Sequence, residues 1–188
     1  VLQALSKAQA LQDDAALLST EALMVRLGKP GLQPEGRFFP DTYTYAKGSS
    51  DIAVLQRAMR AMDKKLEAAW ATRAPNNVLQ TPEQALILAS IVEKETGTPS
   101  DRAQIAAVFS NRLRIGMRLQ TDPTVIYGLG DKFDGNLRKV DLITDTPWNT
   151  YTRAGLPPTP ISMPGKGALL AAVQPAPSKA LYFVARGD

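Results

Sequence analysis

The sequence predicts the α+β fold class, as a helix-rich domain with a small, mostly antiparallel β-sheet. Three long segments repeat apolar residues at the three-four spacing of a buried helix face, and a capping residue stands at the start of each. Short runs of β-branched and aromatic residues, bounded by Gly and Pro, are typical of a few brief strands. A chain of 188 residues can bury a core without disulfides, so we expect residues 1–188 to form a single domain.

The beginning of the chain is expected to form two short helices within residues 1–27. Gly28 and Pro30, which follow them, are typical of a helix end. Residues 30–48 are rich in Gly, Pro and aromatic side chains and should form a loop. The end of this loop, residues 42–45, is suited to a short strand.

The first long helix is predicted over residues 49–71, with Ser50 or Asp51 as its cap. Its apolar stripe consists of Ile52, Leu55, Met59, Met62, Leu66 and Ala69. The second begins at the capping box Thr81-Pro82-Glu83-Gln84, with proline in the first turn, and runs to about Thr96.

The third long helix is capped by Ser100 or Asp101 and ends at Gly116. The pattern then becomes irregular as far as residue 164, with an extended piece expected around residues 124–127. A small helix over 167–174 and a strand over 180–185 complete the predicted elements.

The composition removes several classes of chemistry. The chain has no His and no Cys, which excludes Ser-His-Asp triads, thiolate nucleophiles, iron–sulfur ligation and His-bearing zinc sites. Acid–base chemistry must therefore come from Asp, Glu, Lys, Tyr or the chain termini.

Charge and hydropathy restrict the partners. The net charge is only +4, and the basic residues are spread singly, so we expect no nucleic-acid partner. The longest apolar runs, such as residues 85–89, are far shorter than the roughly 20 residues of a membrane-spanning helix. The chain also starts at Val1 without a signal-peptide pattern, so we expect a soluble protein or one whose targeting segment has been removed.

The helix predicted over residues 81–96 places a carboxyl group in an unusual position. At 100° per residue, Glu95 falls in the middle of the apolar arc formed by Leu88, Ile91 and Val92, whereas Glu93 falls well away from it. Burial and the negative end of the helix dipole both raise the pKa of such a carboxyl, as a general acid requires. Fraying at Thr96, which would leave Glu95 half solvated, is the alternative.

Two further clusters carry polar and aromatic groups. Asn111-Arg112-Leu113 and residues 118–127 bring together amide, hydroxyl, carboxylate and phenol groups that could orient a sugar, although Asp122-Pro123 is also an ordinary turn. Trp148-Asn149-Thr150-Tyr151, followed by a proline-rich loop, suits either the wall of a carbohydrate groove or a loop pinned to the core.

Several blocks together resemble the MltG (YceG-like) endolytic murein transglycosylases. They occur in the order of that family and span residues 35–184. The blocks are Glu35-Gly36 through Pro40-Asp41-Thr42, Ala89-Ser90-Ile91-Val92-Glu93-Lys94-Glu95-Thr96, Asn111-Arg112-Leu113, Leu119-Gln120-Thr121-Asp122-Pro123-Thr124-Val125-Ile126-Tyr127-Gly128, and Asn149-Thr150-Tyr151 with Gly155-Leu156-Pro157-Pro158.

The resemblance implies a bacterial enzyme that cleaves the MurNAc–GlcNAc β-1,4 bond of nascent peptidoglycan and leaves a 1,6-anhydro-MurNAc end. It implies Glu95 as the catalytic acid and base, with no metal or cofactor. Gln120, Thr121, Asp122 and Asn149 would then position the sugar or stabilise its transition state, and Tyr127 and Tyr151 would line the groove. Asp41 is expected either to support another side chain of the site or to cap its own loop, and Glu93 is the main rival for the catalytic role.

The resemblance also implies what surrounds this region. Family members carry an N-terminal membrane anchor and a LysM-like module, and they usually continue beyond the final strand, so the present chain would be the catalytic domain truncated at both ends. The whole protein would sit in the inner membrane with this domain facing the periplasm. Its partners would be glycan strands and cell-wall synthases.

Two other functions stay open on the sequence. A hydrolytic muramidase would use water as the nucleophile and would need a second carboxylate, for which Asp122 is the candidate. A non-catalytic glycan-binding or scaffold module would not need Glu95. A carboxyl group on a buried arc argues against a non-catalytic module, because an apolar residue at this position would pack without a desolvation cost.

Overall fold

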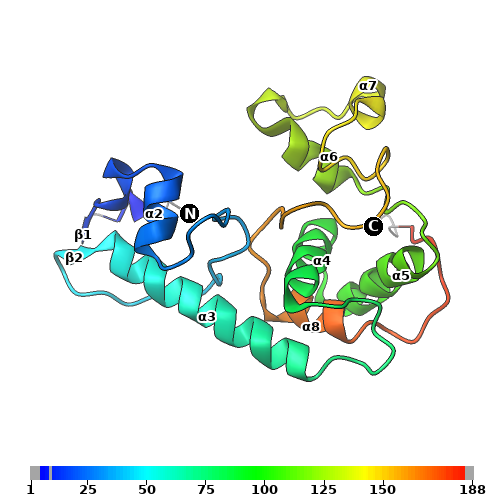
Figure 1. Cartoon of the computed structure of the whole chain (residues 1–188), viewed down its shortest axis with the longest axis horizontal. Coiled ribbons are helices and arrows are strands. Elements are labelled where there is room, and N and C mark those ends of the chain that lie inside the picture. The colour runs from blue at the N-terminus through cyan, green and yellow to red at the C-terminus, as the bar shows by residue number, and fades with distance from the viewer. Residues whose placement is uncertain (1–4, 9, 185–188) are drawn as a thin grey trace.

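The computed structural model describes residues 5–8 and 10–184, and helices make up most of its regular structure (Figure 1). The described elements are, in chain order, β1 (Leu11–Gln12), η1 (Ala15–Leu17), α2 (Thr20–Arg26), β2 (Ser49–Ser50), α3 (Asp51–Ala71), α4 (Pro82–Glu95), η2 (Pro99–Asp101), α5 (Arg102–Arg114), α6 (Asp122–Leu129), η3 (Gly130–Lys132), α7 (Lys139–Ile143) and α8 (Lys166–Val173).

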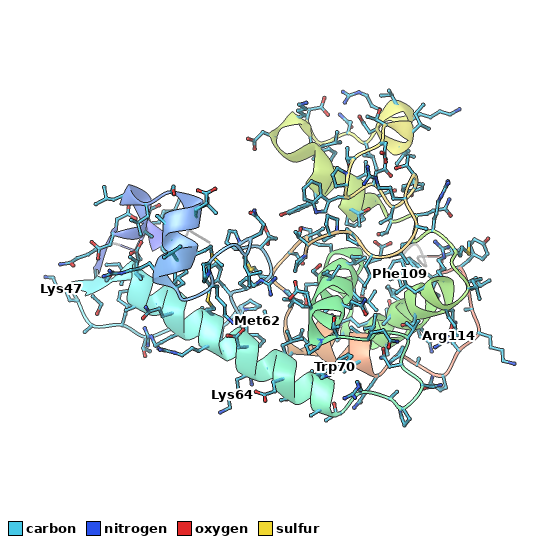
Figure 2. The ribbon with its side chains drawn as sticks, in the orientation of Figure 1. Lys47, Met62, Lys64, Trp70, Phe109 and Arg114 are labelled. Carbon is cyan, nitrogen blue, oxygen red and sulfur yellow. The ribbon has the colours of Figure 1, made fainter. Side chains whose placement is uncertain are left out.

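Helix α3 connects two groups of elements (Figure 1). The strands and α2 lie along its first half, where Leu55 and Met59 pack against Met24 and Phe38 in a small core. Helices α4, α5 and α8 gather beside its second half around the larger core. In Figure 2, Met62 lies on the side of α3 that faces the rest of the molecule, whereas Lys64 points the opposite way.

Helix α4 is the central element of the larger group. It packs against α3, α5, α6 and α8, and residues 85–92 are all buried. Thr81 accepts a hydrogen bond from the Gln84 amide at 3.2 Å, which confirms one half of the predicted capping box. The Gln84 side chain accepts its hydrogen bond from the amide of Gln80, the residue before the cap, at 2.6 Å and not from that of Thr81.

A proline-rich loop is pinned to the middle of α4 through Ser90. The buried Ser90 hydroxyl accepts a hydrogen bond from the Ile161 amide at 3.0 Å, and the Ser90 carbonyl accepts one from the Ser162 hydroxyl at 2.9 Å. This loop in turn packs against Gly36, so the segment before α3 is held on the same side of the molecule.

The predicted helices are largely confirmed. For two of them, α3 and α4, the predicted capping residue is confirmed as well. Helices α3, α4, α5 and α8 correspond to the segments predicted over 49–71, 81–96, 100–116 and 167–174. Ser50 caps α3 by accepting from the Ile52 amide at 3.3 Å. Helix α2 corresponds to the second of the two helices expected before Gly28, and part of the first falls outside the described residues.

The predicted sheet is wrong in its direction and its location. The sheet within the described residues has two strands, β1 and β2, which pair in parallel with Leu11 opposite Ser49 and Gln12 opposite Ser50. Residues 42–45 form no strand, and neither do residues 180–184, while Ala185 lies outside the described part. The side chain of Asn111 binds the carbonyls of Ser178 and Ala180, so these groups are not left for a neighbouring strand.

The extended piece predicted at residues 124–127 is also wrong, because this region is the helix α6. Its β-branched residues favour a strand by propensity alone. However, Pro123 stands in the first turn, the Thr124 hydroxyl bonds to the Thr121 carbonyl at 2.7 Å, and Val125 is buried. Tertiary packing therefore overrides the local preference.

None of the described helices is long and apolar enough to cross a membrane.

Candidate active site

The carboxyl group of Glu95 stands at the last residue of α4, where the buried helix reaches the surface. It is half-buried, and its Oε2 accepts a hydrogen bond of 2.9 Å from the hydroxyl of Thr121. Burial raises the pKa of Glu95 above its ordinary value and is the largest influence on it. The Thr121 hydrogen bond and the charge of Arg112 lower the pKa, and the charge of Asp122 raises it.

A raised pKa fits a carboxyl that must donate a proton near neutral pH. The sequence left two alternatives for Glu95, a carboxyl enclosed by the apolar arc or one half solvated at a frayed helix end. In the structure α4 stays helical as far as Glu95 and the residue is half-buried, so its position lies between the two.

Thr121 is held in place by Thr150 from a distant loop. The Thr121 amide donates to the Thr150 hydroxyl at 3.1 Å, and the hydroxyls of Thr124 and Thr150 are 2.8 Å apart. All three threonines are buried. Sequence reasoning placed Thr121 in the site but gave no role to Thr124 or Thr150, whose participation depends on a contact between segments about 26 residues apart.

Gln120 joins this network through its backbone, which adopts a left-handed conformation with φ of +49°. Its amide donates to the Thr150 carbonyl at 3.1 Å, while its side chain is exposed. Such a φ is uncommon for a residue other than Gly, and strained residues of this kind concentrate at functional sites. Gln120 directly precedes Thr121 in the chain, and its side chain is exposed.

Asp122 and Tyr151 form a second pair beside Glu95. The Tyr151 hydroxyl donates to Asp122 Oδ1 at 2.5 Å. Burial raises the pKa of Tyr151 well above its ordinary value, and the hydrogen bond to Asp122 and the charges of Asp122 and Glu95 raise it further, whereas Arg112 lowers it. Tyr151 is thus kept as a neutral phenol that donates to the exposed carboxylate of Asp122.

Asn149 is fully buried, so its side chain lies inside the protein. Its Nδ2 donates to the carbonyls of Asp141, Leu142 and Thr144 at 3.2, 3.2 and 2.7 Å, and its Oδ1 accepts from the Tyr151 amide at 2.8 Å. These bonds occupy the Nδ2 donors and one lone pair of Oδ1, and burial closes the amide to a ligand from solvent. Asn149 therefore joins the end of α7 to the backbone that carries Tyr151.

Tyr127 lies farther along α6, in an aromatic pair with Trp148. Their rings meet edge to face, with centroids 5.6 Å apart, and the Trp148 indole N–H donates to the Thr159 hydroxyl at 2.9 Å. Burial raises the pKa of Tyr127, the charge of Glu35 raises it further, and Thr159 lowers it. The pKa of Glu35 is itself raised, chiefly by burial.

Glu93 is engaged elsewhere in the structure. Its Oε1 pairs with Arg102 of α5 at 3.3 Å, and its Oε2 accepts from the Gly165 amide at 2.9 Å, just before α8 begins. Glu93 thus ties α4 to the two helices beside it. Asp41 is exposed and accepts a hydrogen bond from the next amide, that of Thr42, at 2.8 Å, which favours its reading as a loop cap.

The described residues place no three acidic side chains close enough together to hold a metal ion. The polar groups around Glu95 are hydroxyl, phenol, amide and carboxylate groups, which hydrogen-bond to sugars and peptides. A half-buried carboxyl beside such groups is suited to acid–base chemistry on a polar organic substrate.

Comparison with known proteins identifies the family. The sequence profile of the YceG-like family matches residues 1–188, and the chain belongs to this family. A crystal structure of a yceG-like protein from Listeria monocytogenes superposes with a TM-score of 0.78 at 31% identity, covering 98% of this chain and 66% of that one.

Two curated relatives carry the name endolytic murein transglycosylase. The protein of Bacillus subtilis is 36% identical over 154 residues, which are 82% of this chain and 42% of that protein. The protein of Streptococcus pneumoniae is 34% identical over 170 residues, which are 88% of this chain and 30% of that protein. The chain therefore spans less than half the length of these relatives.

Proposed function

We propose that this domain is an endolytic peptidoglycan lytic transglycosylase with Glu95 as its single acid–base residue. It would cleave the β-1,4 bond between MurNAc and GlcNAc in nascent glycan strands and leave a 1,6-anhydro-MurNAc end. Two relatives named endolytic murein transglycosylase support the reaction class. The observation that carries the proposal is the half-buried Glu95 carboxyl, which has a raised pKa and a hydrogen bond to Thr121.

The proposed reaction needs only one carboxyl group. Protonated Glu95 donates its proton to the glycosidic oxygen as the bond from that oxygen to C1 of MurNAc breaks. The C6 hydroxyl of the same sugar then attacks C1, and the Glu95 carboxylate takes its proton, so that the residue ends protonated as it began. Because nucleophile and electrophile belong to one ring, the attack has a small entropic cost.

The other predicted site residues have distinct proposed roles. Thr121 holds the Glu95 carboxyl and stabilises its ionised form after the first proton transfer. Gln120, Asp122 and Tyr151 contact the sugar hydroxyls and the acetamido group, and Tyr127 lines the groove beside Trp148. Asn149 acts through the backbone of Tyr151 and does not touch the substrate.

The test is product analysis by mass spectrometry. The parent and Glu95→Gln proteins are incubated with uncrosslinked glycan strands. We expect anhydro-MurNAc ends from the parent and none from the variant. Glu93→Gln is the matched control, because it changes a neighbouring carboxyl on the same helix turn whose partners are structural, and it should retain the activity. Anhydro ends from Glu95→Gln at the parent rate would overturn the role of Glu95.

A hydrolytic muramidase is the second candidate, because Asp122 lies close enough to Glu95 to affect its pKa. It would release ends that are one water heavier than anhydro ends, and the same spectra separate the two reactions. A parent protein that binds glycan strands without cleaving them would instead favour a non-catalytic binding module.

The cellular setting belongs to the same proposal. We propose that residues 1–188 act as one catalytic domain of a longer protein with a membrane anchor and a LysM-like module. The anchor would place the domain on the periplasmic side of the inner membrane, close to newly made glycan strands and to the synthases that make them. Protease accessibility in spheroplasts of cells that produce the full-length protein tests this orientation.

A further inference from the structure

The chain folds back on itself at the end of α5, and this reversal brings two distant segments to one arginine. The Met117 amide bonds to the Arg112 carbonyl at 2.8 Å and the Gly116 amide to the Leu113 carbonyl at 3.2 Å, with Gly116 at φ +70°. This Schellman pattern ends the helix and returns the chain along it. Leu119 is therefore placed next to the side chain of Arg112.

Arg112 is buried, and its guanidinium has three partners. Its Nη1 donates to the Leu119 carbonyl at 2.6 Å, and its Nε donates to the Leu181 carbonyl at 2.7 Å. Its Cζ lies 5.0 Å from the centre of the Tyr182 ring. With a residue exposure of 7%, the arginine is close to fully enclosed by these two segments.

The second of these segments, residues 178–183, lies across α5. The Asn111 side chain donates to the carbonyls of Ser178 and Ala180 at 2.8 and 2.9 Å. The rings of Phe109 and Phe183 meet edge to face with centroids 5.8 Å apart. Figure 2 labels Phe109 and Arg114 on α5. Side chains of one helix thus hold the C-terminal segment at several points.

We propose that Arg112 is a positioning residue for Glu95 and that it makes the candidate active site depend on the C-terminal segment. The Leu119 carbonyl that Arg112 fixes directly precedes the strained Gln120, and Thr121, the hydrogen-bond donor to Glu95, follows. The same guanidinium holds Leu181 and Tyr182, so release of residues 178–183 removes two of its three partners. The inference rests on the proposed role of Glu95.

The groups that face Glu95 set the expected electrostatic effect. Arg112 from α5, Asp122 from α6 and Tyr151 from the following loop all interact with its carboxyl, and Thr121 donates the hydrogen bond. Glu93 and Lys94 precede it on α4. Arg112 is the positive charge among the groups that affect Glu95, and it lowers the pKa of Glu95. Loss of the guanidinium should therefore raise that pKa and loosen Thr121 at the same time.

The first experiment needs no substrate. The side-chain carboxyl signal of Glu95 is titrated by carbon-13 NMR in the parent, Arg112→Gln and Arg112→Lys, and is assigned by its loss in Glu95→Gln. We expect Glu95 to titrate at higher pH in Arg112→Gln than in the parent. In Arg112→Lys, which restores a positive charge, its midpoint should lie close to that of the parent. Arg102→Gln is the matched control on the same helix, since Arg102 pairs with Glu93, and it should leave the midpoint unchanged. An unchanged midpoint in a folded Arg112→Gln protein, or an equal shift in Arg102→Gln, overturns the role of Arg112.

Tyr182→Ala tests the C-terminal segment and covers the case in which Arg112→Gln fails to fold. Tyr182 is 68% exposed, so its truncation should not disturb the core. In Tyr182→Ala we expect the titration midpoint of Glu95 to rise, as in Arg112→Gln, but by less. If the midpoint stays at that of the parent, the dependence on residues 178–183 is overturned.

Cleavage assays separate this inference from the proposed function. If the parent cleaves glycan strands, we expect Arg112→Gln to lower the plateau of kcat roughly tenfold or more and Arg102→Gln to stay within about twofold. A parent without cleavage refutes the proposed function, while the titrations still decide the role of Arg112. If the parent is active but Glu95 titrates at the same pH in the parent and in all the variants, the role of Arg112 is refuted and the proposed function stands.

Discussion

The hydroxyl of Thr121 donates a hydrogen bond of 2.9 Å to Oε2 of Glu95, from the residue before α6 to the last residue of α4. This bond lowers the pKa of a carboxyl that burial raises. The net effect raises the pKa, which favours the protonated acid, while the Thr121 hydrogen bond stabilises the carboxylate that remains after proton transfer.

The first prediction concerns this hydrogen bond. Thr121→Val keeps the shape of the buried side chain but removes the donor that favours the ionised carboxyl. The pKa of Glu95 should rise, so the alkaline limb of kcat/KM, which reports the acid in the free enzyme, should move to higher pH. The measurement is the pH profile of strand cleavage. Thr121→Ser retains a hydroxyl, so its alkaline limb should stay at the pH of the parent. A Thr121→Val profile that coincides with that of the parent would contradict the prediction.

The second prediction is that Glu95 makes the folded protein less stable at neutral pH. Because the pKa of Glu95 is higher in the folded protein than its ordinary value of 4.5, the folded state binds this proton more tightly than the unfolded chain. The destabilisation is absent below pH 4.5 and grows as pH rises through the folded-state pKa. Each unit of difference corresponds to about 1.4 kcal/mol.

Thermal unfolding of Glu95→Gln checks this sign. At pH 7 we expect a Tm above that of the parent, at roughly 2–4 °C per kcal/mol for a domain of this size. At pH 4 the two proteins should unfold at nearly the same temperature. Glu67→Gln, which changes an exposed carboxyl of α3, should match the parent at both pH values. A Glu95→Gln protein less stable than the parent at pH 7 would show that the carboxylate is well accommodated.

The third prediction distinguishes a buried structural amide from a ligand-binding one. Asn149→Asp replaces the Nδ2 donor, which faces three backbone carbonyls, with a carboxylate oxygen that can only accept. We expect a loss of more than about 3 kcal/mol in the free energy of unfolding, measured by urea denaturation at pH 7. Thr144→Val removes an exposed hydroxyl from the same region and should lose less than about 1 kcal/mol. A loss below 1 kcal/mol for Asn149→Asp would mean that the amide is not tied to these carbonyls.

The elements that could be predicted from the sequence are those whose signals are local. Helices α3 and α4 have apolar residues at regular helical spacing and a Ser or Thr cap whose hydrogen bond the structure contains. Helix α6 was missed because its β-branched residues favour a strand, whereas its helical state depends on Val125 packing into the protein. The C-terminal strand was wrongly predicted because α5 side chains take carbonyls that a sheet would use.

In the candidate site, too, the features with a local signal could be predicted and those that depend on long-range contacts could not. The position of Glu95 on an apolar arc follows from helical geometry, but the sequence left open how far its carboxyl is solvated, and in the structure the residue is half-buried. The surroundings of Glu95 come from segments far apart in the chain, and no local pattern reports that Thr150 holds Thr121 or that Arg112 holds Leu119. Motif blocks indicated the region of Asn149 but not that its amide is buried.

The fourth prediction concerns the loop that carries Glu35. Gly36 has φ of +80°, and a Cβ built on it would lie 2.5 Å from Pro160 Cβ. Gly31, on the same loop, has φ of +76° and no atom within 4 Å of such a Cβ. Gly31→Ala should therefore cost only the strain of a left-handed alanine, about 1–2 kcal/mol. Gly36→Ala should cost this strain and, in addition, roughly 1–3 kcal/mol of overpacking against the proline-rich loop.

Urea denaturation of the two alanine variants measures the difference. The extra loss in Gly36→Ala should be large because neither side of the contact can yield easily. Arg37 is held to Glu83 of α4 by two hydrogen bonds of 2.8 and 2.6 Å, and the loop around Pro160 is held to Ser90 of the same helix. Equal stability of the two variants would mean that the proline-rich loop moves freely on α4. In that case Trp148, which is bonded to Thr159 of that loop, would not hold Tyr127 in a fixed place.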